Sequence, residues 1–251
     1  MLKFFGTDGI RGVANRELTP ELALRVGRAS GLVLGDGLGK PILVGRDPRR
    51  SGSMLEGALV AGITSSGLDV ILTGVVPTPA VAFLTKELDC AGGIMISASH
   101  NPLQDNGIKV FGPDGFKLSE DLEGKIEELI AQDDYPRPIG GDVGEVTAKP
   151  DAVKLYAADL KRQVPMDLQG LRLAIDCANG ATSAIAPSIF RALGAEVTSF
   201  YDQPNGVNIN RFCGSTCPEK IRSLTKEVGA DLGFAFDGDG DRILVVDEQG
   251  N

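Results

Sequence analysis

Two kinds of apolar pattern alternate along the chain. Short runs of consecutive apolar residues are typical of buried strands, and they are separated by longer segments in which apolar residues recur every three or four positions, as on one face of a helix. The short runs predict strands over 41–44, 69–72, 93–97, 106–111, 171–176, 196–200, 231–236 and 243–247. The longer segments predict helices over 22–34, 51–66, 79–88, 119–131, 151–163, 182–193 and 218–228. Strands that alternate with helices run mostly parallel, because each helix carries the chain back to the edge where it started.

A stretch of altered composition divides this pattern. Residues 133–150 are rich in Asp, Gly and Pro and carry no periodicity, which is typical of a boundary between domains. The sequence therefore predicts an α/β fold with two consecutive α/β domains, 1–145 and 146–251, each a mostly parallel mixed sheet sandwiched by helices. The last strand is followed by Gln249-Gly250-Asn251, which is typical of a hairpin turn, so we expect the chain to be the front part of a longer protein.

Composition and charge narrow the class of protein. Hydrophobic residues make up 42% of the 251 residues and charged residues 24%, as in an ordinary globular chain. The net charge of −9 argues against nucleic acid or an anionic membrane as a partner, but an anionic small molecule needs only a local cluster of donors. No apolar run reaches the roughly 18 residues of a membrane span, and residues 1–5 lack the core of a signal peptide.

The cysteines indicate no zinc site. Cys90, Cys177, Cys213 and Cys217 match no common zinc-binding spacing, and the chain holds one histidine. Cys90 and Cys177 lie beside or within apolar runs and are predicted to be buried. Cys213 and Cys217 could form a disulfide, although we favour free thiols in a reducing cytoplasm, which is the predicted location.

Three aspartates lie close together after the strand predicted over 231–236. Asp237, Asp239 and Asp241 alternate with Gly238 and Gly240, and carboxylates this close repel one another unless a cation lies between them. In a flat strand their side chains would lie roughly 7 Å apart, so the loop must curl, and glycine allows backbone angles that other residues avoid. Oxygen ligands select Mg²⁺ or Ca²⁺ over zinc or copper. The alternative is a solvated acidic turn.

A second polar turn follows the strand predicted over 93–97. Ser99 lies at its tip, beside His100 and Asn101, and a serine in this place could act as a nucleophile. Serine is weak unaided and needs a base, or an electrophile prepared by charge. The alternative is a turn in which Ser99 and Asn101 hydrogen-bond to their own backbone.

Two basic residues are further candidates. Lys109 alternates with apolar residues, so it could point into a site where partial burial or nearby cations lower its pKa for proton transfer, or it could be a surface lysine. Arg11 ends the glycine-rich turn 5–12, in which backbone amides could approach an anion and the guanidinium could bind phosphate. The turn matches neither the P-loop nor the dinucleotide fingerprint.

Two other loops have weaker signals. The glycine-rich turn 176–180 could bind phosphate, but packing is the favoured interpretation. Arg49 and Arg50 lie at the start of a helix, where they could contact an anion or tether loops, and we favour the tether.

These motifs together resemble one family. The turn that ends in Arg11, the loop Ser97-Ala98-Ser99-His100-Asn101-Pro102, the segment 106–109 and the loop 237–242 occur in the order found in the α-D-phosphohexomutases. The resemblance spans the whole chain. Within the family the opening turn, residues 176–182 and the segment 205–210 are most similar to bacterial phosphoglucosamine mutases.

The resemblance implies a role for each candidate residue. Ser99 would carry a phosphoryl group, and a phosphoserine oxygen would join the carboxylates of Asp237, Asp239 and Asp241 around Mg²⁺. Lys109, Arg11 and His100 would lie beside the phosphoserine and assist proton transfer and charge stabilisation. The phosphate-binding residues would be Arg11, Arg242 and Asn101.

The resemblance also implies ligands and a reaction. The substrate would be a sugar phosphate, with Mg²⁺ and an activating hexose 1,6-bisphosphate as cofactors, no nucleic acid or membrane partner, and a homodimer left open. The expected reaction interconverts glucosamine 6-phosphate and glucosamine 1-phosphate. Phosphomannomutase or phosphoglucomutase activity, and a non-catalytic module that binds Mg²⁺ or phosphate, are the alternatives.

The sequence departs from the family pattern. We expect these 251 residues to lack the sugar-reading third domain and the phosphate-binding fourth domain of the family, and therefore to bind sugar phosphates weakly and to turn over poorly or not at all. Smaller departures are Pro48, where relatives commonly have threonine, and Cys217.

Overall fold

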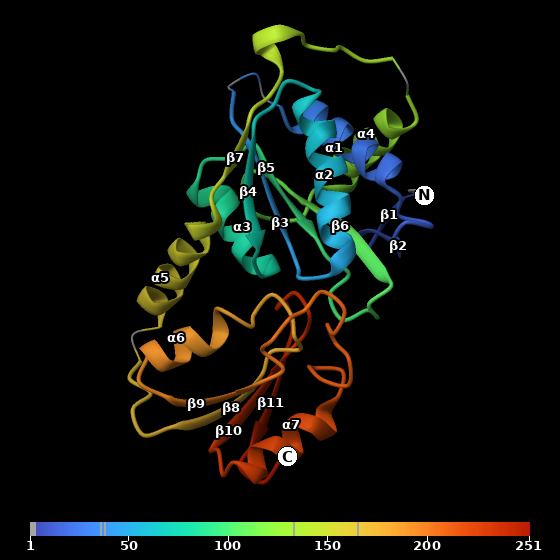
Figure 1. Ribbon diagram of the computed structural model, residues 1–251. Coiled ribbons are helices and arrows are strands. Elements are labelled where there is room, and N and C mark those ends of the chain that lie inside the picture. Colours follow the sequence, from blue (N-terminus) through green and yellow to red (C-terminus); the bar gives the residue numbers. More distant parts are fainter. Residues whose placement is uncertain (1–3, 36, 38, 133, 165) are drawn as a thin grey trace.

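Two β-sheets, each covered by helices on both faces, make up the computed structural model of the protein (Figure 1). It describes residues 4–35, 37, 39–132, 134–164 and 166–251. Residues 1–3 of the predicted N-terminal segment and residue 133 of the predicted boundary lie outside the described residues. Within these ranges, no helix combines the length and the apolar character needed to cross a membrane.

The first sheet has the strand order β1-β2-β6-β5-β3-β4-β7. Its strands are β1 (Phe5–Gly6), β2 (Gly9–Val13), β3 (Ile42–Arg46), β4 (Val70–Val75), β5 (Gly92–Ile96), β6 (Asp105–Phe111) and β7 (Val146–Ala148). Strands β5, β3, β4 and β7 are parallel, whereas β6, β2 and β1 pair antiparallel with their neighbours. Parallel strands place their carboxyl ends at one edge of the sheet, which is where polar loops gather in α/β folds.

Helices cover both faces of this sheet (Figure 1). On one face the apolar sides of α1 (Pro20–Leu34), α2 (Arg50–Thr64) and α4 (Glu120–Ile130) pack on the strands. On the other face lie α3 (Thr78–Glu87) and part of α5 (Val153–Gln163), which follows the short 3₁₀ turn Pro150–Ala152. A further 3₁₀ turn spans Gly140–Asp142.

The second sheet has the order β11-β10-β8-β9. Its strands are β8 (Arg172–Asp176), β9 (Glu196–Phe200), β10 (Leu232–Phe236) and β11 (Ile243–Asp247). Strands β10, β8 and β9 are parallel, and β11 pairs antiparallel with β10. Helix α6 (Ala186–Ala192) packs on one face and α7 (Pro218–Glu227) on the other.

The predicted elements form close to their predicted positions, with three differences. The glycine-rich turn 5–12 is largely the strand pair β1–β2, because β2 extends the first sheet by pairing with β6. Helix α6 begins at Ala186 and not at residue 182, since residues 182–185 form turns beside residues 237–241, here called the acidic loop. Strand β7 was not predicted, and it pairs with β4 just after the predicted boundary between residues 145 and 146. That boundary stays a prediction.

Candidate active site

The two sheets bring their carboxyl-terminal edges together, and the candidate residues lie where the loops from these edges meet. Ser99 lies three residues beyond β5, and Asp237 directly follows β10. In Figure 1 the loops of the first sheet face those of the second across this region. The candidate site is therefore built from both halves of the chain.

The hydroxyl of Ser99 points at the acidic loop. Ser99 is buried, and its Oγ donates a short hydrogen bond to Oδ2 of Asp237. The same oxygen lies 3.4 Å from Oδ1 of Asp241 and 3.4 Å from Nδ1 of His100. The fold thus joins a serine and a carboxylate that are 138 residues apart in sequence.

The neighbouring Asn101 is engaged within its own loop. Its Nδ2 donates to Oδ2 of Asp105 at 2.9 Å, and its backbone N–H donates to the carbonyl of Ala98. The alternative interpretation, in which both side chains bond to their own backbone, describes neither residue, because Asn101 bonds to the carboxylate of Asp105 and Ser99 bonds to Asp237 after β10 of the second sheet.

The three aspartates converge. One carboxylate oxygen from each of Asp237, Asp239 and Asp241 lies within 4.8 Å of the others. Gly240 has a φ of 70°, as the predicted curl requires, but Gly238 does not have a positive φ. Glycine is needed at 238 for another reason, because a Cβ there would lie 2.6 Å from the carbonyl oxygen of Ser99. The expectation that both glycines serve backbone angles is therefore wrong for Gly238, which serves close approach.

Lys109 is the cation of this cluster. Its Nζ lies 2.6 Å from Oδ2 of Asp239 and 2.8 Å from Oδ2 of Asp241, while its neighbours on β6 face the apolar core. Burial alone would lower the pKa of Lys109, but the two carboxylates outweigh burial and raise it. The expected lowering of this pKa is thus wrong, because the expectation considered partial burial or nearby cations, whereas the fold places two carboxylates beside the ammonium.

The carboxylates differ in charge. Burial, followed by the charge of Asp239, raises the pKa of Asp237 to about 7. Burial also opposes ionisation of Asp241, yet the hydrogen bond and charge of Lys109 hold its pKa below the usual value. Oδ1 of Asp239 is buried and has no hydrogen-bond partner in the described part of the chain. A carboxylate oxygen left in this state is unfavourable, and a hard divalent cation among the three aspartates would satisfy it, so the residues fit Mg²⁺ or Ca²⁺.

The raised pKa of Asp237 predicts that Mg²⁺ binding strengthens with pH. Below about pH 7 the cation must displace a proton from Asp237, and above it the carboxylate is already free. In the metal-free protein Asp237 is protonated to a greater extent in the folded than in the unfolded state between about pH 4 and 7, so its contribution to stability falls as pH rises through this window. The Mg²⁺-induced rise in Tm should therefore be larger at pH 8 than at pH 6. Equal rises at both pH values, or the same pH dependence in Asp237→Asn, would contradict this assignment.

Three further candidates lie near the serine, and two of them, Arg242 and Arg11, carry positive charge. Nη1 of Arg242 lies 3.1 Å from Nδ1 of His100, and its Nε lies 3.8 Å from Oδ1 of Asp241. Burial lowers the pKa of His100, and the charges of Arg242 and Arg11 lower it further. Arg11 contacts Asp8 at 3.4 Å, and among the described residues its side chain makes no hydrogen bond to Ser99 or to the acidic loop. Its buried Nε also lacks a partner there, which leaves it open to an anion.

Arg49 anchors the segment 97–105, here called the serine loop, by hydrogen bonds to its backbone. Its guanidinium is buried, pairs with Oδ2 of Asp47 at 2.9 Å, and donates to backbone carbonyls of the loop. These carbonyls belong to Ser99, Asn101, Pro102 and Asp105. Asp47 also accepts a hydrogen bond from Ser97, whose Oγ receives the N–H of Ser99. The prediction of a loop tether is confirmed for Arg49.

Sequence reasoning missed two supporting residues. Thr78 starts α3 and donates its hydroxyl to Oδ2 of Asp239 at 2.6 Å, while its N–H donates to the carbonyl of Asp239. Asn210 donates to the carbonyl of Ser99 at 2.8 Å. A usable signal for Thr78 was its place after β4, at the same sheet edge as Ser99. The only signal for Asn210 was its membership of the distinctive segment 205–210.

The turn 176–180 packs against the acidic loop, as favoured. A Cβ on Gly180 would lie 2.4 Å from the carbonyl oxygen of Gly238, and the N–H of Ala181 donates to that carbonyl. Asp176 accepts the N–H groups of Ala178 and Gly214. The turn therefore supports the acidic loop.

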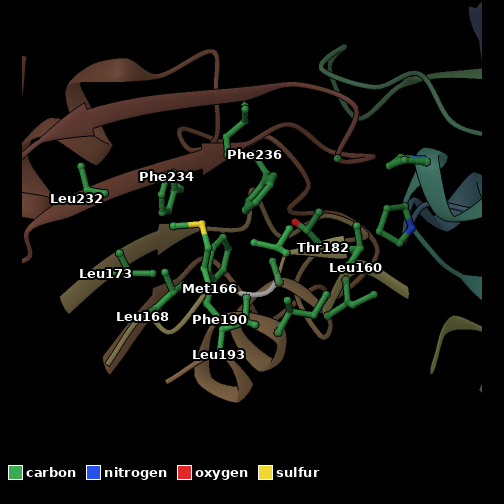
Figure 2. A pocket seen from close by; sticks show the side chains of 18 of the residues that line it. Leu160, Met166, Leu168, Leu173, Thr182, Phe190, Leu193, Leu232, Phe234 and Phe236 are labelled. Carbon is green, nitrogen blue, oxygen red and sulfur yellow. The ribbon is translucent and has the colours of Figure 1, made fainter. Parts of the chain in front are cut away.

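An apolar cavity lies beside the site but carries none of its charges. A cavity of about 410 Å³ lies between α6 and the second sheet, and the stacked rings of Phe190 and Phe234 line it together with leucines (Figure 2). Gly240 and Thr182 border it, and no ionisable carboxylate or amine lines it. A smaller cavity of about 160 Å³ adjoins Lys109 and Asp241 instead. The candidate active site is therefore located by the cluster of ionisable residues and not by the larger of these two cavities.

Comparisons with known proteins cover both halves of the chain. The family model described as phosphoglucomutase/phosphomannomutase, alpha/beta/alpha domain I, matches residues 2–137, and that of alpha/beta/alpha domain II matches residues 154–250. The phosphoglucosamine mutases of Bacillus cytotoxicus and Geobacillus thermodenitrificans are 54% and 56% identical over 254 aligned residues. The alignments cover 100% of this chain and 57% of each relative, so the chain spans little more than half their length.

Solved structures are similar over the same extent. A phosphoglucomutase/phosphomannomutase family protein of Burkholderia thailandensis has a TM-score of 0.88 at 30% identity, covering 100% of this chain and 56% of that chain. A putative phosphomannomutase of Thermus thermophilus has a TM-score of 0.82 at 28% identity, covering 98% and 57%. The arrangement of two sheets is therefore shared with these proteins.

Proposed function

Because the chain belongs to the phosphoglucomutase/phosphomannomutase family, we propose that it carries the phosphoryl-transfer site of a phosphoglucosamine mutase. That enzyme would interconvert glucosamine 6-phosphate and glucosamine 1-phosphate through a phosphoserine and a hexose 1,6-bisphosphate. The observation that carries the proposal is the hydroxyl of Ser99, which is buried and directed at the acidic loop beside Lys109.

Ser99 is proposed to be the phosphoryl acceptor. A phosphoryl group would move from a sugar oxygen to Oγ, so that the sugar O–P bond breaks, the Oγ–P bond forms, the hydroxyl proton leaves Oγ, and the departing sugar oxygen takes up a proton. Nδ1 of His100 lies 3.4 Å from Oγ, and burial and the nearby arginines lower the imidazole pKa and favour its neutral form. Nδ1 now accepts from Arg242 and the hydroxyl donates to Asp237, so His100 would take the proton once Arg242 turns to a phosphate oxygen and the hydroxyl leaves Asp237. His100 is thus the proposed proton acceptor.

The remaining candidates supply positive charge. Lys109 keeps its proton because two carboxylates raise its pKa, so we assign it to charge stabilisation, with proton transfer only once the carboxylates are engaged elsewhere. Arg11 and Arg242 flank His100 and would bind phosphate oxygens. Asn101 would need to release Asp105 before it could join them. Phosphoryl transfer depends mainly on positioning and charge neutralisation, which such groups provide.

Mg²⁺ is the proposed metal. Asp237, Asp239 and Asp241 would hold it, with an oxygen of phosphorylated Ser99 as a further ligand, and the unpartnered oxygen of Asp239 supports this assignment. A cation there would neutralise charge on the phosphoryl group during transfer. A hexose 1,6-bisphosphate would supply the first phosphoryl group.

The choice of sugar follows from the relatives. The phosphoglucosamine mutases are 54–56% identical to this chain, whereas the family protein of Burkholderia thailandensis is 30% identical, which favours glucosamine phosphate. A cytoplasmic enzyme is supported by the four free cysteines, which a reducing compartment would keep as thiols. The homodimer stays a prediction.

The proposal is tested by labelling Ser99. The protein in its full length is incubated with Mg²⁺ and glucose 1,6-bisphosphate, and its intact mass and tryptic peptides are measured. We expect the mass of one phosphoryl group on the peptide that contains Ser99, and none in Ser99→Ala, whose folding is checked by thermal unfolding. A Ser99 that stays unmodified at saturating bisphosphate, or a label elsewhere that persists in Ser99→Ala, would refute the proposal.

A further inference from the structure

The backbone of the serine loop is held in an unfavourable conformation. Ser99 has a φ of 53°, in the left-handed region that costs a non-glycine residue about 1 kcal/mol or more. It lies three residues beyond the end of β5 and receives no ladder hydrogen bond from a neighbouring strand. Such a residue keeps its conformation only where its surroundings fix it.

Two carbonyls of the loop are each held twice. Nη2 of Arg49 donates to the carbonyls of Ser99 and Asn101 at 3.0 and 2.9 Å. Nδ2 of Asn210 donates to the same two oxygens at 2.8 and 3.1 Å. Arg49 directly precedes α2, which packs on the first sheet, whereas Asn210 belongs to the half of the chain that forms the second sheet. Residues from both halves of the chain therefore hydrogen-bond to the backbone of the serine loop.

Asn210 is itself fixed in place. Its φ is 56°, a conformation that asparagine tolerates better than most residues, and its N–H donates to the carbonyl of Ala178 at 2.9 Å. A Cβ added to Gly238 would lie 3.0 Å from Nδ2 of Asn210 and 2.6 Å from the carbonyl oxygen of Ser99. The amide thus lies where the serine loop and the acidic loop touch.

We propose that Asn210 is a positioning residue, whose amide holds the Ser99 loop in its left-handed conformation and so keeps the hydroxyl aimed at the acidic loop. It acts through the carbonyls of Ser99 and Asn101 and not through the reacting atoms. The claim that Asn210 fixes the conformation of the serine loop depends on these contacts alone. Its consequence for phosphoryl transfer rests on the proposed function.

The test uses two substitutions that suit a positive φ. Asn210→Gly removes the side chain without backbone strain, and Asn210→Asp keeps the shape but replaces the donor with a carboxylate that faces two carbonyl oxygens. Asn208→Ala is the matched control, because the side chain of Asn208 bonds only to Gln203 and Asn205 of its own loop. Since glycine also lowers stability through the unfolded chain, the aspartate variant separates that effect from loss of the donor.

The first measurement is amide hydrogen exchange. We expect the exchange rate in the peptide that spans residues 97–103 to rise about tenfold in both Asn210 variants, because each loses the two hydrogen bonds to the carbonyls of Ser99 and Asn101. The rate should stay unchanged in Asn208→Ala. Serine-loop exchange within twofold of the unsubstituted protein in either Asn210 variant would overturn the proposal. So would an increase spread evenly over both sheets, because Asn210 would then act on global stability.

The second measurement is the rate of Ser99 labelling in the full-length protein at saturating glucose 1,6-bisphosphate. We expect the rate in both variants to fall by about tenfold, with the half-saturating bisphosphate concentration little changed, because a mispositioned nucleophile lowers the rate and not the binding. If Ser99 of the unsubstituted protein is not labelled, that result counts against the proposed function. The hydrogen-exchange result then decides whether Asn210 holds the serine loop. Loosened exchange with an unchanged labelling rate would overturn the positioning role.

Discussion

Arg49→Met is expected to destabilise the folded protein by about 3–5 kcal/mol, the cost of breaking a buried ion pair by removing one partner. The guanidinium and the carboxylate of Asp47 are both fully buried, and the guanidinium also donates to four carbonyls of the serine loop. Methionine fills a similar volume but leaves these acceptors without their donor. Burial already raises the pKa of Asp47, and loss of Arg49 would favour its protonated form further.

Urea unfolding at pH 7 measures this effect. Arg50→Met is the matched control, because Arg50 is the next residue and its side chain is exposed, so its loss should change the free energy of unfolding by less than about 0.5 kcal/mol. Arg49→Lys should recover part of the loss, since lysine keeps the charge but lacks the planar fork. Equal midpoints for Arg49→Met and Arg50→Met would show that the buried pair is not what holds this edge of the sheet.

Asp239→Asn is expected to weaken Mg²⁺ binding by at least about 100-fold, because Asp239 would bind the cation directly. This loss exceeds the one that is usual when a residue that only hydrogen-bonds to a metal ligand is changed. The substitution keeps the volume but removes one of three negative charges and one ligand oxygen. Thr78 and Lys109 hold the other oxygen of Asp239 at 2.6 Å each, so the carboxylate is already aimed when the cation arrives. The loss should therefore appear in affinity and not in the number of bound ions.

Isothermal titration calorimetry with MgCl₂ checks the prediction. Asp247→Asn is the control, because Asp247 ends β11 away from the cluster and accepts hydrogen bonds from Gln249 and Asn251. Thermal unfolding of both variants without metal separates loss of ligand from loss of fold. An Mg²⁺ affinity in Asp239→Asn equal to that of the control would place the cation elsewhere.

Secondary structure followed closely from local pattern. Strand β9 and helix α7 occur within one residue of their predicted limits, because apolar periodicity and flanking glycine or proline act over a few neighbouring residues. The elements that were missed depend on distant partners. Strand β2 forms because β6 lies beside it, and β7 because β4 does, and neither segment has a periodic pattern of its own.

The site was only partly predictable for the same reason. The serine, the three aspartates and Lys109 stood out by residue type and order, whereas Thr78 and Asn210 matter through contacts that span 161 and 111 residues of sequence. The pKa of Lys109 shows the limit most clearly. The sign of its shift depends on whether carboxylates or cations face it, and that became known only from the pairs with Asp239 and Asp241.

The sequence by itself determined the order of strands and helices, the curled acidic loop and the polar serine turn, because these depend on periodicity, glycine and the composition of short segments. Tertiary structure alone decided that the two turns meet, that Gly238 is glycine for lack of space, and that Asp237 holds its proton near neutral pH. Charge interactions and burial depend on distances in space, and distance along the chain does not fix them.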